Sequence, residues 1–256
     1  MSSSLTSGTT RFQHESRFSR FEHPFAWRLV TATMTARQSE FPDWLDLKFD
    51  RGALKSEQAA HAAATRARDA MFEALRPFGA EGTRLTKEHM FLLSASNRAF
   101  ALHEAVVREA DHDNPHAAFT LLRAMLDLVL VLLEVRRNPG YASVVMDVTG
   151  PNRTARGPLK SQKLLARARQ ELPNLKGVWD DLSEVAHFGR EGFLQTIKSA
   201  TEADGALRVS VSTEAGFREP DDKAVAIVGA AVMSEMVAAT FRKILADRPP
   251  GAPTSD

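Results

Sequence analysis

A long apolar stretch over residues 115–137 constrains the fold more than any other feature of the sequence. An Asn-Pro pair opens it and a second Asn-Pro pair follows it, which predicts one helix with a defined start and stop. Its most apolar part, 117–135, contains Arg123, Asp127 and Glu134. Because an Arg or Asp in mid-span costs about 2.5–3.5 kcal/mol in a membrane, we expect the central core helix of a folded domain and no membrane span.

The charged residues of this helix share one narrow face. At about 100° per residue, Arg123, Asp127 and Glu134 align with His116 and Thr120. One interpretation is the solvent-facing strip of an otherwise buried helix. The other is a polar cleft between helices, in which an Arg–Asp pair could orient an anionic or polar ligand. The sequence leaves both open.

The rest of the chain predicts an all-α fold, an antiparallel bundle of about seven helices with a small β-hairpin before the last helix. We expect one helical domain over 57–247 with the hairpin at 193–213, after an N-terminal helix and loop at 23–56. Disordered tails are expected at 1–22 and 248–256. Further helices are predicted over 57–76, 87–110, 141–148, 159–172, 173–189 and 221–246.

Composition narrows the function classes. Lys and Arg (33) nearly cancel Asp and Glu (32), so no global field would hold nucleic acid or an anionic membrane, and the sequence carries no strong nucleic-acid signature. The absence of cysteine excludes disulfides, thiolate zinc sites and cysteine nucleophiles. No dinucleotide or phosphate-binding loop is present, so we expect no cofactor, and a cytoplasmic location is compatible with the composition.

Histidines recur on an apolar face of the 87–110 helix. His89, Ser96 and His103 lie within about 40° of one another there. Hydrogen-bonded core histidines explain such a face more often than metal ligands do. The stretch 111–116 also contains two His and two Asp, but its Asn-Pro pair indicates a capping turn. We therefore predict no metal site.

The stretch WDDLSEVAHFG at 179–189 raises the question of catalysis. Asp180, Ser183 and His187 share one helix face, yet nothing supplies a nucleophile turn or an oxyanion hole, so a Ser–His–Asp triad is not favoured. Gly189 is typical of a helix cap. We expect His187 to reach a neighbouring helix instead, with the 115–137 helix as its apt partner.

Two motifs together carry a family resemblance. The combination of LLRAMLDLVLVLLEVRRNP with LSEVAHFG resembles a group of uncharacterised bacterial helical proteins. That resemblance implies that Arg123, Asp127, Ser183 and His187 form one cluster, and it implies no chemistry.

The run Arg98-Ala-Phe-Ala-Leu-His103 is similar to the Arg and His spacing of HEPN domains, which are helical proteins of toxin–antitoxin and defence systems. The resemblance implies a metal-independent RNase, a homodimer by expectation, with Arg98 and His103 as catalytic residues. On one continuous helix these side chains point about 140° apart, so they would need a helix irregularity or a composite dimer site.

The main functional hypothesis is a polar inter-helical cleft that binds a small polar ligand or a protein partner. Arg123, Asp127 and Ser183 would bind, and His187 would bind or act as an acid or base. The RNase is one alternative, and a purely structural module is another. The structural module would oligomerise through the small-residue stripe of 60–74.

Overall fold

The computed structural model describes residues 51–79, 85–146, 160–186, 197–201, 207–211, 216–217 and 220–248. Within these residues the chain forms seven α-helices and two short 3₁₀ helices. The α-helices are α2 (Glu57–Leu75), α3 (Lys87–Asp111), α4 (Pro115–Arg137), α5 (Gly140–Met146), α7 (Ser161–Ala168), α8 (Leu175–Ala186) and α10 (Pro220–Asp247). The 3₁₀ helices η2 (Arg51–Lys55) and η3 (Arg76–Gly79) flank α2.

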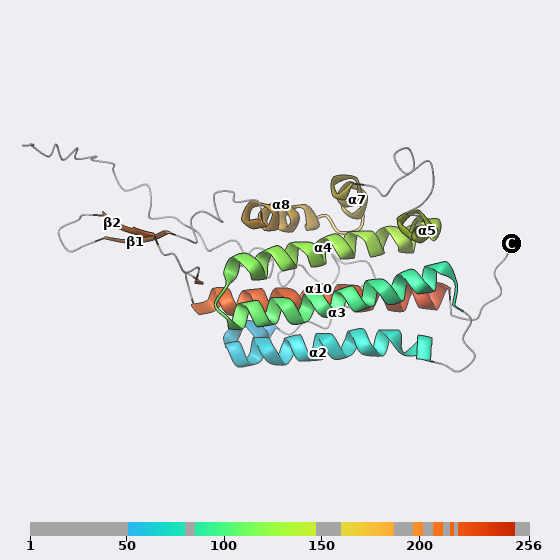
Figure 1. The fold of residues 1–256 in the computed structure, drawn as a ribbon, viewed down its shortest axis with the longest axis horizontal. Helices are drawn as coiled ribbons and strands as arrows, with labels where there is room; N and C mark the ends of the chain where they lie inside the picture. Colours follow the sequence, from blue (N-terminus) through green and yellow to red (C-terminus); the bar gives the residue numbers. More distant parts are fainter. Residues whose placement is uncertain are drawn as a thin grey trace, which may run out of the picture.

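The last helix and the apolar helix at 115–137 are both core helices of the bundle. Helix α10 packs against α2, α3 and α4, and Figure 1 shows it running between α2 on one side and α4 on the other. Helices α7 and α8 cover the outer side of α4, while α5 contacts α3 and α4. The expectation that 115–137 forms a core helix is confirmed, because most of α4 is buried and it contacts α3, α5, α7, α8 and α10.

The small residues of α2 explain how α10 can be enclosed so tightly. One face of α2 is buried, and it faces α10, its main neighbour. Because all the buried residues of this face except Met71 are alanines, the two backbones can approach closely, and close packing of buried apolar atoms stabilises the bundle. This face is consumed inside the chain, so it offers no surface for oligomerisation. Its buried residues are Ala60, Ala63, Ala64, Ala67, Met71 and Ala74.

The turn between α3 and α4 is a capping turn, as the sequence indicates. The Asn114 side chain accepts a hydrogen bond from the backbone N–H of Ala117 at 3.3 Å. Beside it, Asp113 adopts a left-handed φ of 57° and accepts a hydrogen bond from the backbone N–H of Phe217 at 3.1 Å. A Cβ on Gly216 would lie 2.9 Å from Asp113 Oδ2, so a larger residue there would require the Asp113 side chain to shift. The turn thereby holds the segment that leads into α10.

The predicted fold class needs a correction at the hairpin. All the packing of the bundle that the described residues show is between helices, and no strand forms part of it. Strands β1 (Ile197–Thr201) and β2 (Leu207–Val211) pair antiparallel with each other and lie beyond the end of the helices (Figure 1). Each strand has five residues, and two such strands without further support form at most a marginally stable sheet. The packed bundle is therefore all-α. The prediction that a β-hairpin belongs to this fold was wrong, since the two described strands pair only with each other.

Helix α10 also draws attention for its hydropathy. Among the described helices it alone is long and apolar enough to cross a membrane, over Asp221–Asp247, and its apolar window is entirely buried inside the bundle. A core helix passes the same test of length and composition, and burial accounts for the apolar surface here. Of the expected N-terminal segments, the tail at 1–22 and the first part of the helix and loop at 23–56, up to residue 50, lie outside the described residues.

Candidate functional site

Three of the four residues expected to cluster meet between α4 and α8. The Arg123 Nε donates a hydrogen bond to Ser183 Oγ at 3.0 Å. Its Nη1 forms an ion pair with Asp127 Oδ2 at 2.5 Å, one helical turn away. The fourth residue, His187, lies outside the described residues, and so does Gly189.

Trp179 completes the setting of the arginine. The guanidinium carbon of Arg123 lies 4.4 Å from the centre of the Trp179 ring, a cation–π contact, and the side chain is only 8% exposed. Planar stacking and a fork of donors are properties that lysine lacks. One arginine therefore fixes α8 against α4.

Ser183 and Asp180, two members of the triad considered for 179–189, both contact residues outside that triad. Ser183 Oγ accepts from Arg123 and donates to the Trp179 carbonyl at 2.6 Å. Asp180 forms an ion pair with Lys176 on its own helix. No base contacts this hydroxyl among the residues that the structure describes, and a hydroxyl committed in this way beside a guanidinium is a poor nucleophile.

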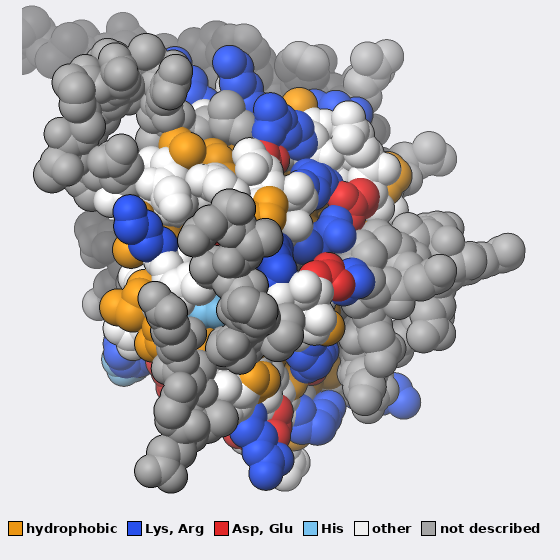
Figure 2. Space-filling model, turned by 90° about the vertical axis from the view of Figure 1, so that its right-hand side faces the viewer, with side chains coloured by type: hydrophobic (Ala, Val, Ile, Leu, Met, Phe, Trp, Pro, Cys, Tyr) orange, Lys and Arg blue, Asp and Glu red, His pale blue; other side chains and the backbone are white. Residues whose placement is uncertain are grey.

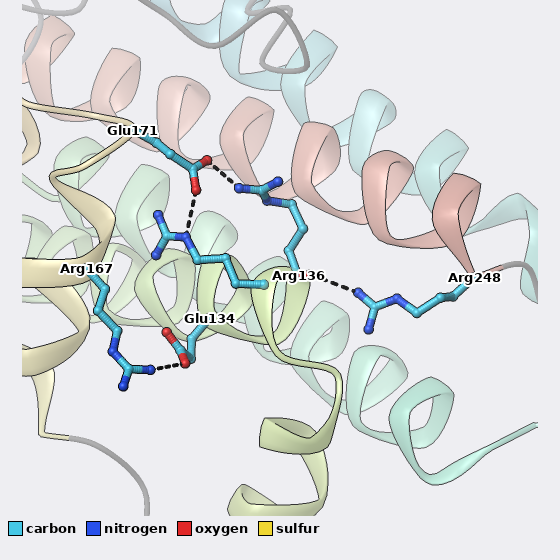
Figure 3. Close-up of polar contacts among 6 residues, drawn as sticks. Glu134, Arg136, Arg167, Glu171 and Arg248 are labelled. Atoms are coloured by element: carbon cyan, nitrogen blue, oxygen red, sulfur yellow. Dashed lines mark hydrogen bonds and ion pairs between the residues drawn. The ribbon is translucent and has the colours of Figure 1, made fainter. Parts of the chain in front are cut away.

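The polar face of α4 is covered along its C-terminal half. Glu134 is 1% exposed and pairs with Arg167 of α7 (Figure 3), and beyond it Arg137 Nε contacts Glu171 Oε1 at 2.6 Å. Arg136 also pairs with Glu171. Since Arg123 and Glu134 face α8 and α7, the interpretation as a solvent-facing strip is wrong for them.

This end of the bundle is rich in charge. Figure 2 looks onto it and shows Lys and Arg side chains gathered with acidic side chains between them. The Arg136 pKa lies below its usual value because of burial, which outweighs the attraction of Glu171. The acids shared among these arginines indicate a structural network that holds α7 on α4.

An open groove lies on the other side of Asp127, between α3 and α4 and beside α5. Its volume is about 500 Å³, within the range of small-molecule sites. Arg98 and Asp127 are its charged lining residues, and Ser94 and Asn97 add polar groups from α3. The remaining lining is apolar, formed by Phe91, Ala95, Ala101, Ala124, Leu128, Val131 and Val145.

Arg98 and His103 do not come together. Arg98 is exposed on the groove side of α3, whereas His103 is 2% exposed in the core against α10. His103 Nδ1 shares a hydrogen bond of 2.8 Å with Ser234 Oγ, and burial lowers the pKa of the imidazole. A second copy of the chain could not reach this histidine either, so the geometry gives no composite RNase site from these two residues.

The other polar residues on that face of α3 are satisfied locally. His89 Nδ1 accepts from the Thr86 backbone N–H at 3.1 Å in a capping box. Ser96 Oγ donates to the Leu93 carbonyl at 2.7 Å. The interpretation of these groups as hydrogen-bonded core residues is confirmed.

Sequence reasoning missed a polar group that joins three helices. Glu57 and His61 of α2 meet Asp111 of α3, with candidate metal-ligand atoms within 4.8 Å of one another. Lys223 of α10 lies among them, with its Nζ 2.6 Å from Glu57 Oε1 and 3.7 Å from Asp111 Oδ1. The ammonium supplies the positive charge that the carboxylates need, and their contact lowers the Glu57 pKa and raises that of Lys223.

Only the Glu57 and His61 spacing of this group is visible in the sequence, because its other members come from distant helices. The groove was missed for a related reason. Its other polar residues lie on α3, and only the packing of α3 against α4 brings them near Asp127.

Comparisons of the chain with known protein families, with curated proteins and with solved structures found no match. The two resemblances drawn from the sequence therefore stay predictions.

Proposed function

We propose that this protein binds a small amphipathic acid in the groove between α3 and α4. The ligand's apolar body would lie along the aliphatic and aromatic lining, and its anionic group would face Arg98. The observation that carries the proposal is a hollow of about 500 Å³ with mostly apolar walls and a few polar groups that converge on it.

The charge of Arg98 supports an acidic ligand. Its guanidinium is exposed and forms no ion pair with any residue that the structure describes. Arginine donates two parallel hydrogen bonds to a carboxylate or phosphate, so an exposed arginine at the edge of an apolar groove is suited to an acid with an apolar body.

The ion pair behind the groove supports a preformed site. Asp127 is held by Arg123, which is itself held by Ser183 and Trp179. A wall fixed by several contacts loses little conformational entropy on binding. A hollowed groove also suits a small molecule better than it suits the flat surface of a protein partner.

The cysteine-free composition fits a cytoplasmic protein.

The test is a titration of the full chain with 3-phenylpropanoate, a simple acid with an apolar body, followed by calorimetry and by amide NMR shifts. We expect saturable binding with shifts at groove residues. Arg98→Gln should weaken the affinity by about tenfold or more, because a charge-assisted pair is lost. Arg66→Gln is the matched control, since Arg66 is exposed on α2 away from the groove.

Two results would overturn the proposal. One is no saturable binding of the acid to the folded chain. The other is an equal loss of affinity in Arg98→Gln and Arg66→Gln, which would indicate nonspecific attraction to surface charge.

A further inference from the structure

Asp127 has more acceptor capacity than its own chain uses. A carboxylate offers about four lone-pair positions. Asp127 Oδ2 contacts Arg123 at 2.5 Å, and Oδ1 is buried without a hydrogen bond. Because Oδ1 is closed to solvent, a ligand would reach Asp127 through the exposed remainder of its side chain, where Oδ2 can accept a second N–H beside Arg123.

The surroundings of Arg123 leave the exposed part of the Asp127 side chain uncovered. Its Nε is committed to Ser183 at 3.0 Å and its guanidinium lies against the Trp179 ring. Arg123 therefore approaches Asp127 from the α8 side. The part of the Asp127 side chain that is exposed, 39% of it, borders the groove.

Two opposite charges line the groove without meeting each other. Arg98 and Asp127 both border it, and they form no ion pair with each other. Apart from Ser94 and Asn97, the rest of the lining is apolar. A ligand that carries both an acid and an amine could bridge this gap.

We propose that the ligand is an amine-bearing acid with an apolar body, similar to an apolar amino acid. Its ammonium N–H would donate to Asp127, and its carboxylate would accept from Arg98. This inference rests on the function proposed for the groove and adds Asp127 as the residue that selects for the amine.

Three matched compounds test it on the full wild-type chain. Phenylalanine carries both groups, 3-phenylpropanoate lacks the amine, and phenethylamine lacks the acid. We expect phenylalanine to bind about tenfold more tightly than 3-phenylpropanoate, because one charge-assisted hydrogen bond is added. Phenethylamine should bind weakest, since Arg98 opposes it.

The outcomes separate the two proposals. If 3-phenylpropanoate binds through Arg98 but phenylalanine binds no more tightly, this inference is overturned and the acid-binding groove stands. If neither compound binds, the groove function fails and the inference fails with it.

A substitution at Asp127 tests the amine contact separately. Asp127→Asn should bring the ratio of the two affinities, phenylalanine to 3-phenylpropanoate, down to about one, because the amine contact loses its anion. Asp69→Asn, at an exposed position on α2, should keep the preference. A preference that survives in a folded Asp127→Asn protein would contradict the assignment. The wild-type comparison decides the question even if that variant does not fold.

Discussion

At the scale of single residues, His103 shows how burial sets a protonation state. Its imidazole is enclosed between α3 and α10, and desolvation holds its pKa below the ordinary value of about 6.5. The folded state therefore prefers the neutral ring, whereas the unfolded chain takes up a proton near pH 6.5. Stability is present above that pH and is lost as the pH falls through 6.5 toward the lower folded pKa.

This gives a pH prediction. Between about pH 7.5 and pH 5 the free energy of unfolding should fall, by about 1.4 kcal/mol for each unit that separates the two pKa values. His103→Gln cannot titrate, so its unfolding free energy should depend less on pH over this range. Urea unfolding at each pH measures both. His112→Gln, at an exposed histidine, should keep the wild-type dependence. An unchanged pH dependence in His103→Gln would contradict the role of burial.

At the scale of elements, the ends of the helices are tied by one arginine. Arg248 follows α10 and donates to the carbonyl of Val135, in the last turn of α4, at 3.3 Å. Its Nη1 also contacts Glu88 Oε1, in the first turn of α3, at 2.5 Å. Burial raises the Glu88 pKa, and Arg248 opposes that shift. A residue placed at the start of the C-terminal tail thus joins three helices.

Arg248→Ala should therefore destabilise the bundle. The substitution leaves a half-buried carboxylate and helix carbonyls without their donor, at a cost of about 1–3 kcal/mol. Lys243→Ala is the control, because Lys243 forms an exposed pair with Asp247 near the same helix end at 2.9 Å, and should cost less than about 0.5 kcal/mol. Urea unfolding of the wild type and the two variants measures both costs. Equal midpoints for the two variants would contradict the proposed stabilisation by Arg248.

The element scale also shows what the sequence could predict. Caps and periodicity placed the long helices closely: residues 87–110 and 115–137 were expected, and α3 and α4 span Lys87–Asp111 and Pro115–Arg137. The alignment of Arg123 with Asp127 follows from helix geometry alone. Which helix would cover them does not, because contacts with Ser183 and Trp179 depend on packing between segments far apart in the chain.

At the scale of the whole molecule, the bundle is organised by the burial of α10. The residues of this helix are apolar or small on nearly every face, so no single amphipathic face marks it in the sequence. The groove and the α4–α8 cluster both lie on elements that pack outward from it. Its position therefore depends on how closely α2 can approach.

A single added side chain at that contact tests this dependence. Ala67 is buried on the face of α2 toward α10, so Ala67→Leu should overpack the interface and cost about 1–3 kcal/mol in unfolding free energy. Ala62→Leu adds the same atoms at an exposed position of α2 and should change stability by less than about 0.5 kcal/mol. Thermal unfolding compares the two, and light scattering follows the mass. Were Ala67 part of an interface between copies, Ala67→Leu would instead change the mass at unchanged stability. The burial of this face predicts the opposite, a loss of stability at constant mass.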